Sequence, residues 1–185
     1  MLPLSPRIAP PNGSTPLISA AQIRRRVAGL AREIDADYRG RALTLVVVLK
    51  GAAIFAADLV RQLTIPVAME FVTASSYGKE VRSSGSVRLA TPDTLDLAGR
   101  DVLVVEDIVD SGLTYRRLME TLGQFAPASL ALCTLLHKQA ARTTVDIRYT
   151  GFEIPNLFVV GYGMDYGERY RNLPEICALT LGSEA

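Results

Sequence analysis

The spacing of hydrophobic positions near the start of the chain predicts one long amphipathic helix. Apolar side chains recur at three- and four-residue intervals from Ile23 to Ile34, which places them on one face of a helix spanning 19–38. Ser19 and Gln22 have the spacing of a capping box, so the helix is expected to begin there. This helix packs one stripe against the core and presents the opposite face to solvent.

Continuous apolar runs, rich in β-branched residues, predict buried strands along the rest of the chain. The runs cover 43–49, 67–73, 101–105, 130–136 and 157–161. Helical spacing at 52–63 and 113–125 places helices between strands, and a polar segment at 75–86 predicts a long loop before a short strand at 87–90. Repeated strand–helix–strand units predict an α/β fold with a mostly parallel, twisted sheet. Ligands of such sheets bind beyond the carboxyl ends of the strands, where function is therefore to be sought.

Length and composition indicate one domain with a short appendage. A chain of 185 residues with 49% hydrophobic residues can bury a core without disulfides or metal. Residues 1–16 carry five prolines and are expected to form a flexible tail, which leaves 17–185 as the domain. No apolar run is long enough to span a bilayer, and we expect a cytoplasmic protein that binds no membrane.

Charge and histidine content exclude several classes of function. The net charge is +1, which argues against a protein that coats nucleic acid. His137 is the one histidine, so a histidine-rich metal site is excluded by count. Cys133 and Cys177 stand in apolar runs and are expected to be buried thiols.

The segment 102–114, VLVVEDIVDSGLT, is the most informative stretch for chemistry. Glu106 and Asp107 close a predicted buried strand, and paired carboxylates suit the vicinal hydroxyls of a sugar. Asp110 and the residues after it lead into a helix, whose free N–H groups suit a phosphate. A phosphate-binding helix start beside carboxylates that bind two neighbouring hydroxyls indicates a site for ribose 5-phosphate. The alternative is an acidic strand end followed by an ordinary Asp or Ser helix cap.

Five segments together resemble a known family. VVEDIVDSGLT at 104–114 is similar to the phosphoribosyl diphosphate (PRPP) signature of the type I phosphoribosyltransferases. The other segments are LKG at 49–51, SSYG at 75–78, Lys138, and FVVGYGMDYGERYRNLP at 158–174. Their order resembles the branch of this family that acts on 6-oxopurines, hypoxanthine or hypoxanthine and guanine. The resemblance extends over about 43–181 and implies a flanked parallel sheet with a small hood and a mobile loop.

The resemblance implies a role for each matching residue at the PRPP site. Glu106 and Asp107 would bind the ribose hydroxyls, Arg171 and the loop at Lys50 would contact diphosphate, and Asp110 would be the general acid/base at N7 of the purine. The family often has a non-proline cis peptide in the Lys50 loop. The full set expected to bind PRPP is Lys50, Gly51, Glu106, Asp107, Asp110, Ser111, Gly112, Leu113, Thr114 and Arg171.

Other positions match the base site, the metal site and the mobile loop. Lys138 would meet the 6-oxo group, Phe158 would stack on the base, and Val159 would lie beside its edge. Mg²⁺ is the implied cofactor, with Asp165 as a ligand. The implied metal set is Asp165, Glu106 and Asp107, and the implied mobile loop contains Ser75, Ser76 and Tyr77.

Simpler interpretations exist for several of these residues. Phe158 could belong to the core, Asp165 could only form a turn, and Arg171 could be a solvated charge. The basic run Arg24, Arg25 and Arg26 is interpreted as a solvated helix face. The sequence departs from the family pattern at two positions, because Ala52 replaces a frequent glycine and Leu157 a frequent polar residue.

The reaction implied is transfer of the phosphoribosyl group from PRPP to hypoxanthine, and to guanine, in purine salvage. Two alternatives stay open: a phosphoribosyltransferase for xanthine, adenine or a pyrimidine, and a PRPP-sensing regulator that binds nucleic acid. The near-zero net charge speaks against the regulator. The family also implies a homodimer or homotetramer, with the proline-rich tail able to cross an interface. The sequence does not rank hypoxanthine against guanine.

Overall fold

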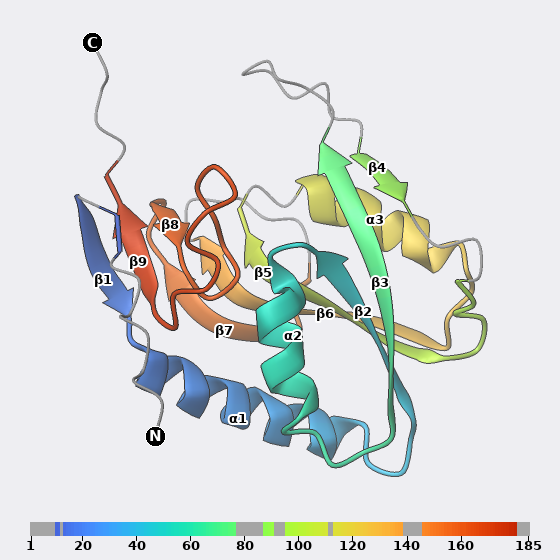
Figure 1. Ribbon diagram of the computed structural model, residues 1–185. Coiled ribbons are helices and arrows are strands. Elements are labelled where there is room, and N and C mark those ends of the chain that lie inside the picture. Colours follow the sequence, from blue (N-terminus) through green and yellow to red (C-terminus); the bar gives the residue numbers. More distant parts are fainter. Residues whose placement is uncertain are drawn as a thin grey trace, which may run out of the picture.

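A six-stranded sheet forms the centre of the computed structural model, which describes residues 10–11, 13–76, 87–90, 95–110, 113–138 and 146–180 (Figure 1). The strands are ordered β4-β3-β2-β5-β6-β7; all neighbours are parallel except β4, which pairs antiparallel with β3. Their bounds are β2 Leu43–Leu49, β3 Val67–Ser76, β4 Val87–Ala90, β5 Asp101–Val109, β6 Ser129–Lys138 and β7 Tyr149–Ile154. The predicted α/β class is confirmed.

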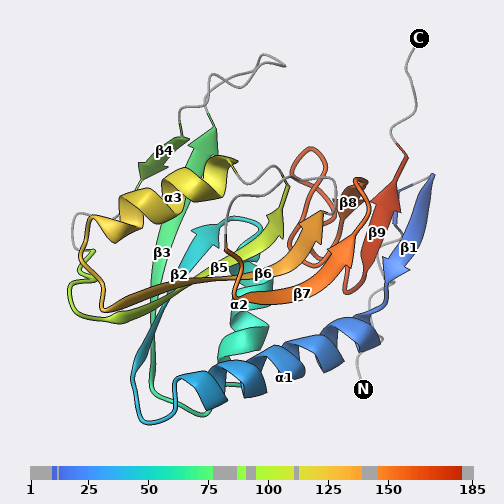
Figure 2. The same ribbon diagram turned by 180° about the vertical axis from the view of Figure 1, so that it is seen from behind.

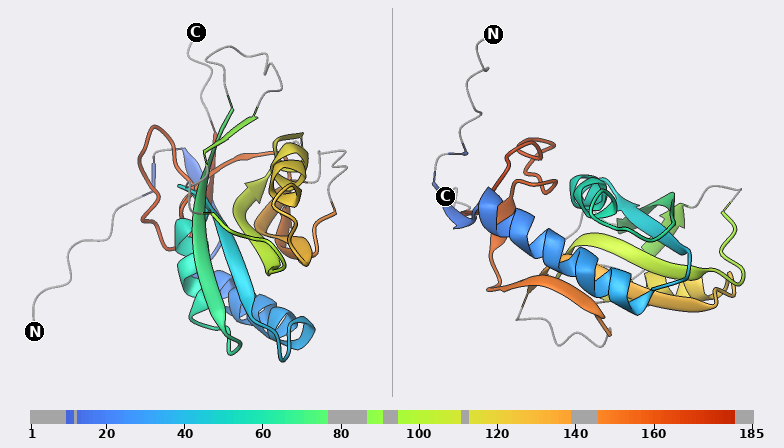
Figure 3. Two further views of the ribbon diagram at one scale, coloured as in Figure 1. Left: turned by 90° about the vertical axis from the view of Figure 1, so that its right-hand side faces the viewer. Right: turned by 90° about the horizontal axis from the view of Figure 1, so that it is seen from below.

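Helices cover both faces of this sheet, as the turned views show (Figure 3). Strand residues alternate between the faces, so Leu45 and Val47 pack with helices α1 (Ala20–Asp37) and α2 (Ala52–Val60). Val46 of the same strand packs instead with α3 (Leu113–Gly123). Two hydrophobic cores therefore sandwich strands that are apolar on both sides, which explains the unbroken apolar runs in the sequence.

Helix α1 has the predicted start and the predicted buried stripe. Ser19 and Gln22 form the capping box, and the apolar stripe from Ile23 to Ile34 is buried. The interpretation of Arg26 as a solvated charge is wrong. Its guanidinium donates to the carbonyl oxygens of Thr150 and Gly151 at 2.6 and 2.9 Å, and so ties α1 to the outer strand β7.

Helix α2 is shorter than its expected range of 52–63. It ends at Val60, and the chain then turns toward β3. The backbone N–H and the hydroxyl of Thr64 donate to the Asp35 carboxylate at 3.0 and 2.8 Å, which holds this turn against α1. Among the described residues, no helix is long and apolar enough to cross a membrane.

A second, three-stranded antiparallel sheet lies beside the carboxyl ends of the central strands (Figure 2). It is ordered β1-β9-β8, from β1 (Ser14–Ile18), β9 (Ile176–Leu179) and β8 (Phe158–Val160), and it is the expected hood. The expected tail of 1–16 is therefore too long, because residues 14–16 belong to β1. Pro16 is tolerated there because β1 is an edge strand with a bulge after Pro16.

The main sheet differs from the predicted one in three places. β7 was not expected, because Gly151 interrupts its apolar pattern; a Cβ at Gly151 would collide with the Leu135 carbonyl oxygen of the neighbouring strand β6. The predicted run at 157–161 is strand β8 of the hood rather than a parallel strand. Finally, β5 and β6 extend to Val109 and Lys138, because backbone pairing continues past the apolar residues.

The mobile-loop prediction falls largely outside the described residues. Ser75 and Ser76, expected in that loop, are the last residues of β3 and pair with Arg88 and Val87 of β4. This ladder corrects the start of the loop, while Tyr77 lies outside the described part of the chain.

Candidate active site

A cavity of about 230 Å³ lies at the carboxyl ends of β5 and β6, facing the hood. Its walls come from the ends of central strands, from β8 and from the turns that follow it. The lining residues are Asp107, Ile108, Asp110, Lys138, Phe158, Val159, Met164 and Asp165. The cavity therefore lies where the parallel topology predicts a ligand, and most of its lining residues were expected at the site.

Lys138 and Asp110 form an ion pair in this cavity. The Lys138 Nζ donates to the Asp110 Oδ2 at 2.7 Å, although the residues are 28 positions apart. Lys138 ends β6 and Asp110 follows β5, and these strands are parallel neighbours. The Lys138 side chain is 11% exposed and that of Asp110 is 63% exposed. A buried ammonium thus stands beside a carboxylate that solvent or a ligand can reach.

Phe158 lies at the edge of the cavity rather than in the core. Its residue is 39% exposed, whereas Val159 beside it is buried. Tyr166 packs edge-on against Phe158, with ring centroids 5.7 Å apart and planes at 84°. The contact orients the Phe158 ring. Sequence reasoning missed Tyr166, although it lies within the matching 158–174 segment.

Glu106 and Asp107 are adjacent carboxyl groups near the end of β5, and their side chains interact with each other. Both lie inside the strand rather than after it, which corrects the predicted strand end and follows from the backbone pairing of β5 with β6. Asp107 lines the cavity and accepts from the Ile108 N–H at 2.9 Å. Glu106 faces α3, where burial, with the neighbouring Asp107 carboxyl, raises its pKa well above its ordinary value. Only Asp107 of the expected pair thus lines the described cavity.

Burial also acts on Tyr115 of α3, which lies on the Glu106 side of β5. Its hydroxyl donates to the Ile108 carbonyl oxygen at 2.8 Å. Burial first, and the nearby Glu106 and Asp107 carboxyl groups next, raise the pKa of Tyr115 well above its ordinary value. The Tyr115 hydroxyl therefore stays protonated and ties α3 to the end of β5.

The loop at Lys50 approaches the site through backbone atoms. The cis peptide bond of this loop joins Leu49 to Lys50, one position before the Lys50–Gly51 bond at which the family resemblance suggested it. A Cβ on Gly51 would collide with the Asp107 carboxylate, and a Cβ on Gly163 would collide with the Gly51 carbonyl oxygen. Glycine is therefore required at both positions for these segments to meet.

Four charged side chains, Lys50, Asp165, Glu168 and Arg171, form a cluster that adjoins the cavity through Asp165. Arg171 contacts Asp165 at 2.8 Å, and its Nη1 donates to the Gly163 carbonyl oxygen at 2.8 Å. Glu168 contacts the Lys50 Nζ at 3.2 Å and the Arg171 Nη2 at 3.3 Å. Hydrogen bonds from Lys50 and then Arg171 lower the pKa of the Glu168 carboxyl. Sequence reasoning missed Glu168, although it lies within the matching 158–174 segment.

Some expected site residues cannot be placed. Ser111 and Gly112 lie outside the described residues, and for Leu113 and Thr114 only the backbone at the start of α3 is described. In the described part of the chain, no group of three or more Asp, Glu, His or Cys side chains is arranged to hold a metal ion. The expected buried state of Cys133 and Cys177 is confirmed, and both are free thiols.

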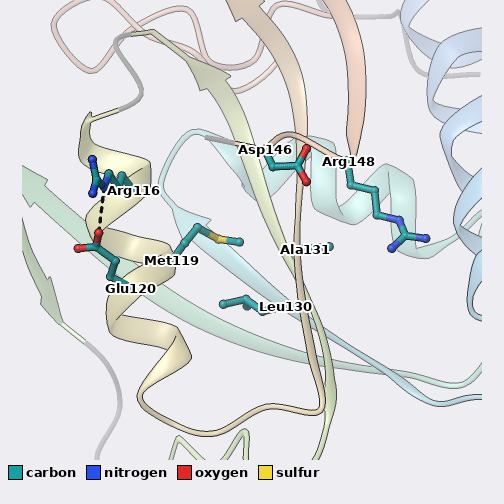
Figure 4. A pocket seen from close by; sticks show the side chains of 7 residues that line it. All are labelled: Arg116, Met119, Glu120, Leu130, Ala131, Asp146 and Arg148. Atoms are coloured by element: carbon teal, nitrogen blue, oxygen red, sulfur yellow. Dashed lines mark hydrogen bonds and ion pairs between the residues drawn. The ribbon is translucent and has the colours of Figure 1, made fainter. Parts of the chain in front are cut away.

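A second cavity, of about 340 Å³, lies between α3, β6 and the start of β7 (Figure 4). Its charged groups are largely paired with one another or with neighbours. Arg116 pairs with Glu120 at 3.0 Å, and Arg148 pairs with Asp37 at 2.9 Å. Leu130 and Ala131 of its floor belong to the amino-terminal half of β6, so this cavity lies away from the carboxyl ends of the strands.

Comparison with known proteins decides the family. A model of the phosphoribosyl transferase domain matches residues 18–167. The chain belongs to the phosphoribosyltransferase family. It is 52% identical over 170 residues to a hypoxanthine-guanine phosphoribosyltransferase of Mycobacterium avium, covering 88% of this chain and 84% of that protein. A hypoxanthine phosphoribosyltransferase of Salmonella typhimurium is 43% identical over 171 residues, covering 91% and 96%.

Solved structures agree with this assignment. The crystal structure of a hypoxanthine-guanine phosphoribosyltransferase from Bacillus anthracis is similar at a TM-score of 0.85 and 41% identity, covering 90% of this chain and 98% of that one. The predicted family, the type I phosphoribosyltransferase fold and the enzyme class are confirmed. The phosphoribosyltransferase described here groups with purine-salvage enzymes, so PRPP and a purine base are its class of substrates.

Proposed function

We propose that this phosphoribosyltransferase converts hypoxanthine and PRPP to IMP and diphosphate, and guanine to GMP by the same route. The observation that carries the proposal is the Lys138–Asp110 pair, 2.7 Å apart in the cavity that Phe158 borders. One group donates hydrogen bonds and the other accepts them. Together they match the edge of a 6-oxopurine, on which O6 accepts and a protonated N7 donates.

The same pair argues against adenine as the substrate. Adenine carries an amino group at position 6, which would face the ammonium of Lys138, a group with three donors and no acceptor. The Lys138 side chain is only 11% exposed, so water cannot readily relieve the mismatch. A site built around one polar partner rejects an analogue that leaves its buried groups unpaired.

Residues of the cavity can assist each step of the phosphoribosyl transfer. N9 of the base attacks C1′ of the ribose, the N9–C1′ bond forms, and the bond from C1′ to the diphosphate oxygen breaks with its electrons on the diphosphate. The proton on N7 passes to Asp110 as general base. Asp107 and the neighbouring backbone hold the ribose, while residues 110–114, which precede and begin α3 in the sequence, receive the 5′-phosphate. Phe158 holds the base plane, so positioning is the main contribution of the protein.

The donor set at the cavity fits Mg²⁺. Asp107 and Asp165 both line it, and Mg²⁺ in phosphoryl sites takes one or two carboxylates together with water and substrate phosphates. Asp165 and Asp107 would hold the ion, whereas Glu106, which was also expected to be a ligand, is not among the residues that line the cavity. When bound, Mg²⁺ supplies positive charge to the leaving diphosphate. Lys50 and Arg171 would supply further positive charge to the same group.

The deciding experiment is a purine assay with purified protein, PRPP and Mg²⁺. We expect IMP and diphosphate from hypoxanthine, with adenine turnover at background. Hypoxanthine, guanine, xanthine and adenine are compared in the same assay, and omission of Mg²⁺ is expected to abolish the reaction. Absence of turnover with every purine would overturn the proposal and reopen the nucleic-acid-binding regulator. Preference for xanthine or adenine would instead change the substrate assigned to the site.

Assembly and location are further parts of the proposal. Family membership supports a homodimer or homotetramer of this single-domain chain, which light scattering after size exclusion tests directly. A cytoplasmic location stays a prediction, and so does the flexible tail expected over 1–16, of which residues 1–9 and 12 lie outside the described part of the chain.

A further inference from the structure

Glu168 occupies an unusual position among the charged groups beside the cavity. Its carboxylate lies between Lys50 and Arg171, at 3.2 and 3.3 Å from their nitrogen atoms. These are the two cations to which the proposed function assigns the diphosphate. The Oε2 atom of Glu168 contacts both cations at once, so it uses donors on both that a diphosphate oxygen would also need.

The charges of this cluster cancel before any substrate arrives. Lys50 and Arg171 are balanced by Asp165 and Glu168. Asp165 and Arg171 are 28% and 26% exposed, so their contact is partly shielded, whereas Lys50 and Glu168 are 68% and 66% exposed. Ion pairs between exposed side chains contribute little stability, so the Glu168 contacts are the ones that a polyanion can displace at low cost.

The turn that carries Glu168 is held in place by contacts that do not involve its carboxylate. The Tyr162 hydroxyl donates to Asp58 of α2 at 2.6 Å, and Tyr162 is buried. Gly163 packs against the Gly51 carbonyl oxygen and receives Arg171 through its own carbonyl. The Glu168 side chain can therefore leave Lys50 without detaching the turn from α2.

We propose that Glu168 is an internal competitor for diphosphate. Its carboxylate forms ion pairs with Lys50 and Arg171 in the substrate-free enzyme. These ion pairs break when the diphosphate group of PRPP, or the diphosphate product, binds the two cations. This inference rests on the proposed function, because it takes Lys50 and Arg171 to be diphosphate ligands. Glu168 thus weakens the binding of diphosphate and speeds its release.

The test measures binding of inorganic diphosphate with Mg²⁺ to the full chain by calorimetry. Glu168→Gln keeps the shape of the side chain and removes its charge. We expect the Kd of the variant to be about 2- to 5-fold lower than that of the wild type, the size of an exposed ion pair. The difference shrinks in high salt, because exposed charges are screened. In turnover, the KM for PRPP falls while kcat stays equal or falls with slower product release.

Glu120→Gln is the matched control. Glu120 is also exposed, at 59%, and also pairs with an arginine, Arg116, but it lies on α3 beside the second cavity (Figure 4). This variant is expected to bind diphosphate as the wild type does, and thermal unfolding checks that both variants are folded.

The possible outcomes separate the two proposals. Equal or weaker diphosphate binding by Glu168→Gln, with normal binding by the wild type, overturns the competitor role alone. Weaker binding in particular would make Glu168 a residue that positions the cations. A wild type that does not bind diphosphate overturns the diphosphate assignment of Lys50 and Arg171, and the competitor role with it.

Discussion

The two halves of the active site hold their cations in opposite ways. In the base half, Lys138 is nearly buried at the end of a central strand, with an 11% exposed side chain. In the diphosphate half, Lys50 lies on a loop and is 68% exposed. A buried cation must be satisfied by its ligand, so it selects one base over another. An exposed cation attracts anionic groups of any shape. It therefore helps diphosphate to bind and to leave, but it does not discriminate between ligands.

The backbone explains this difference. The base half is built on parallel strands whose ladder fixes the position of each side chain. The diphosphate half is built on turns, in which Gly163, Glu168 and Tyr170 all have positive φ angles. Such turns are held by a few specific contacts rather than by a sheet. Substitutions in the two halves should therefore differ in size and in their dependence on salt.

The largest effect is expected from Asp110→Asn in the base half. An amide preserves the shape of the side chain but cannot take the N7 proton, so kcat should fall about 10²- to 10⁴-fold. PRPP affinity should stay close to that of the wild type. Steady-state kinetics with hypoxanthine, together with calorimetric titration of PRPP, measure both quantities. A kcat near that of the wild type would remove Asp110 from the proton transfer.

Lys138→Ala is expected to have the next largest effect. Loss of a charged hydrogen bond to the 6-oxo group should lower kcat/KM for hypoxanthine about 10- to 100-fold. PRPP binding should be retained, because Lys138 contacts only the base half. The wild type and the variant are assayed with hypoxanthine and adenine side by side. A fully active variant, or equal rates of the wild type with both bases, would contradict the role given to Lys138.

Tyr166→Ala tests whether the base half needs its second ring. Without the edge contact, Phe158 loses its orientation, and the KM for hypoxanthine should rise about 2- to 10-fold, the worth of one aromatic pair. Tyr166→Phe keeps the ring and should behave as the wild type in the same kinetics. If both variants raise the KM equally, the hydroxyl rather than the ring is what matters.

The smallest effect is expected from Lys50→Ala in the diphosphate half. Removal of an exposed cation should weaken PRPP binding about 2- to 5-fold at low salt. The loss should nearly vanish at high salt, whereas the loss in Lys138→Ala should persist. Titrations at two ionic strengths compare the variants. A loss at Lys50 that is large and independent of salt would abolish the distinction between the two halves.

Local patterns predicted much of the fold and of the base half. The apolar runs of β2, β5 and β6 were found because these strands are buried on both faces. The meeting of Asp110 with Lys138 could be anticipated from parallel strand order alone. Strands β1, β7 and β9 were missed, because Pro16 interrupts β1, Gly151 interrupts β7, and β9 has only four residues, too few for a pattern to stand out.

The sequence by itself determined the class of fold, the family and the end of the sheet at which chemistry occurs, because these follow from local periodicity and from motifs of neighbouring residues. Tertiary structure alone decided that Asp107, and not Glu106, lines the cavity, and that Arg26 binds the strand β7 rather than water. It also decided that Glu168 reaches Lys50, 118 residues away. Charged side chains make such contacts wherever the fold brings a partner within a few ångströms, and no local pattern encodes that distance.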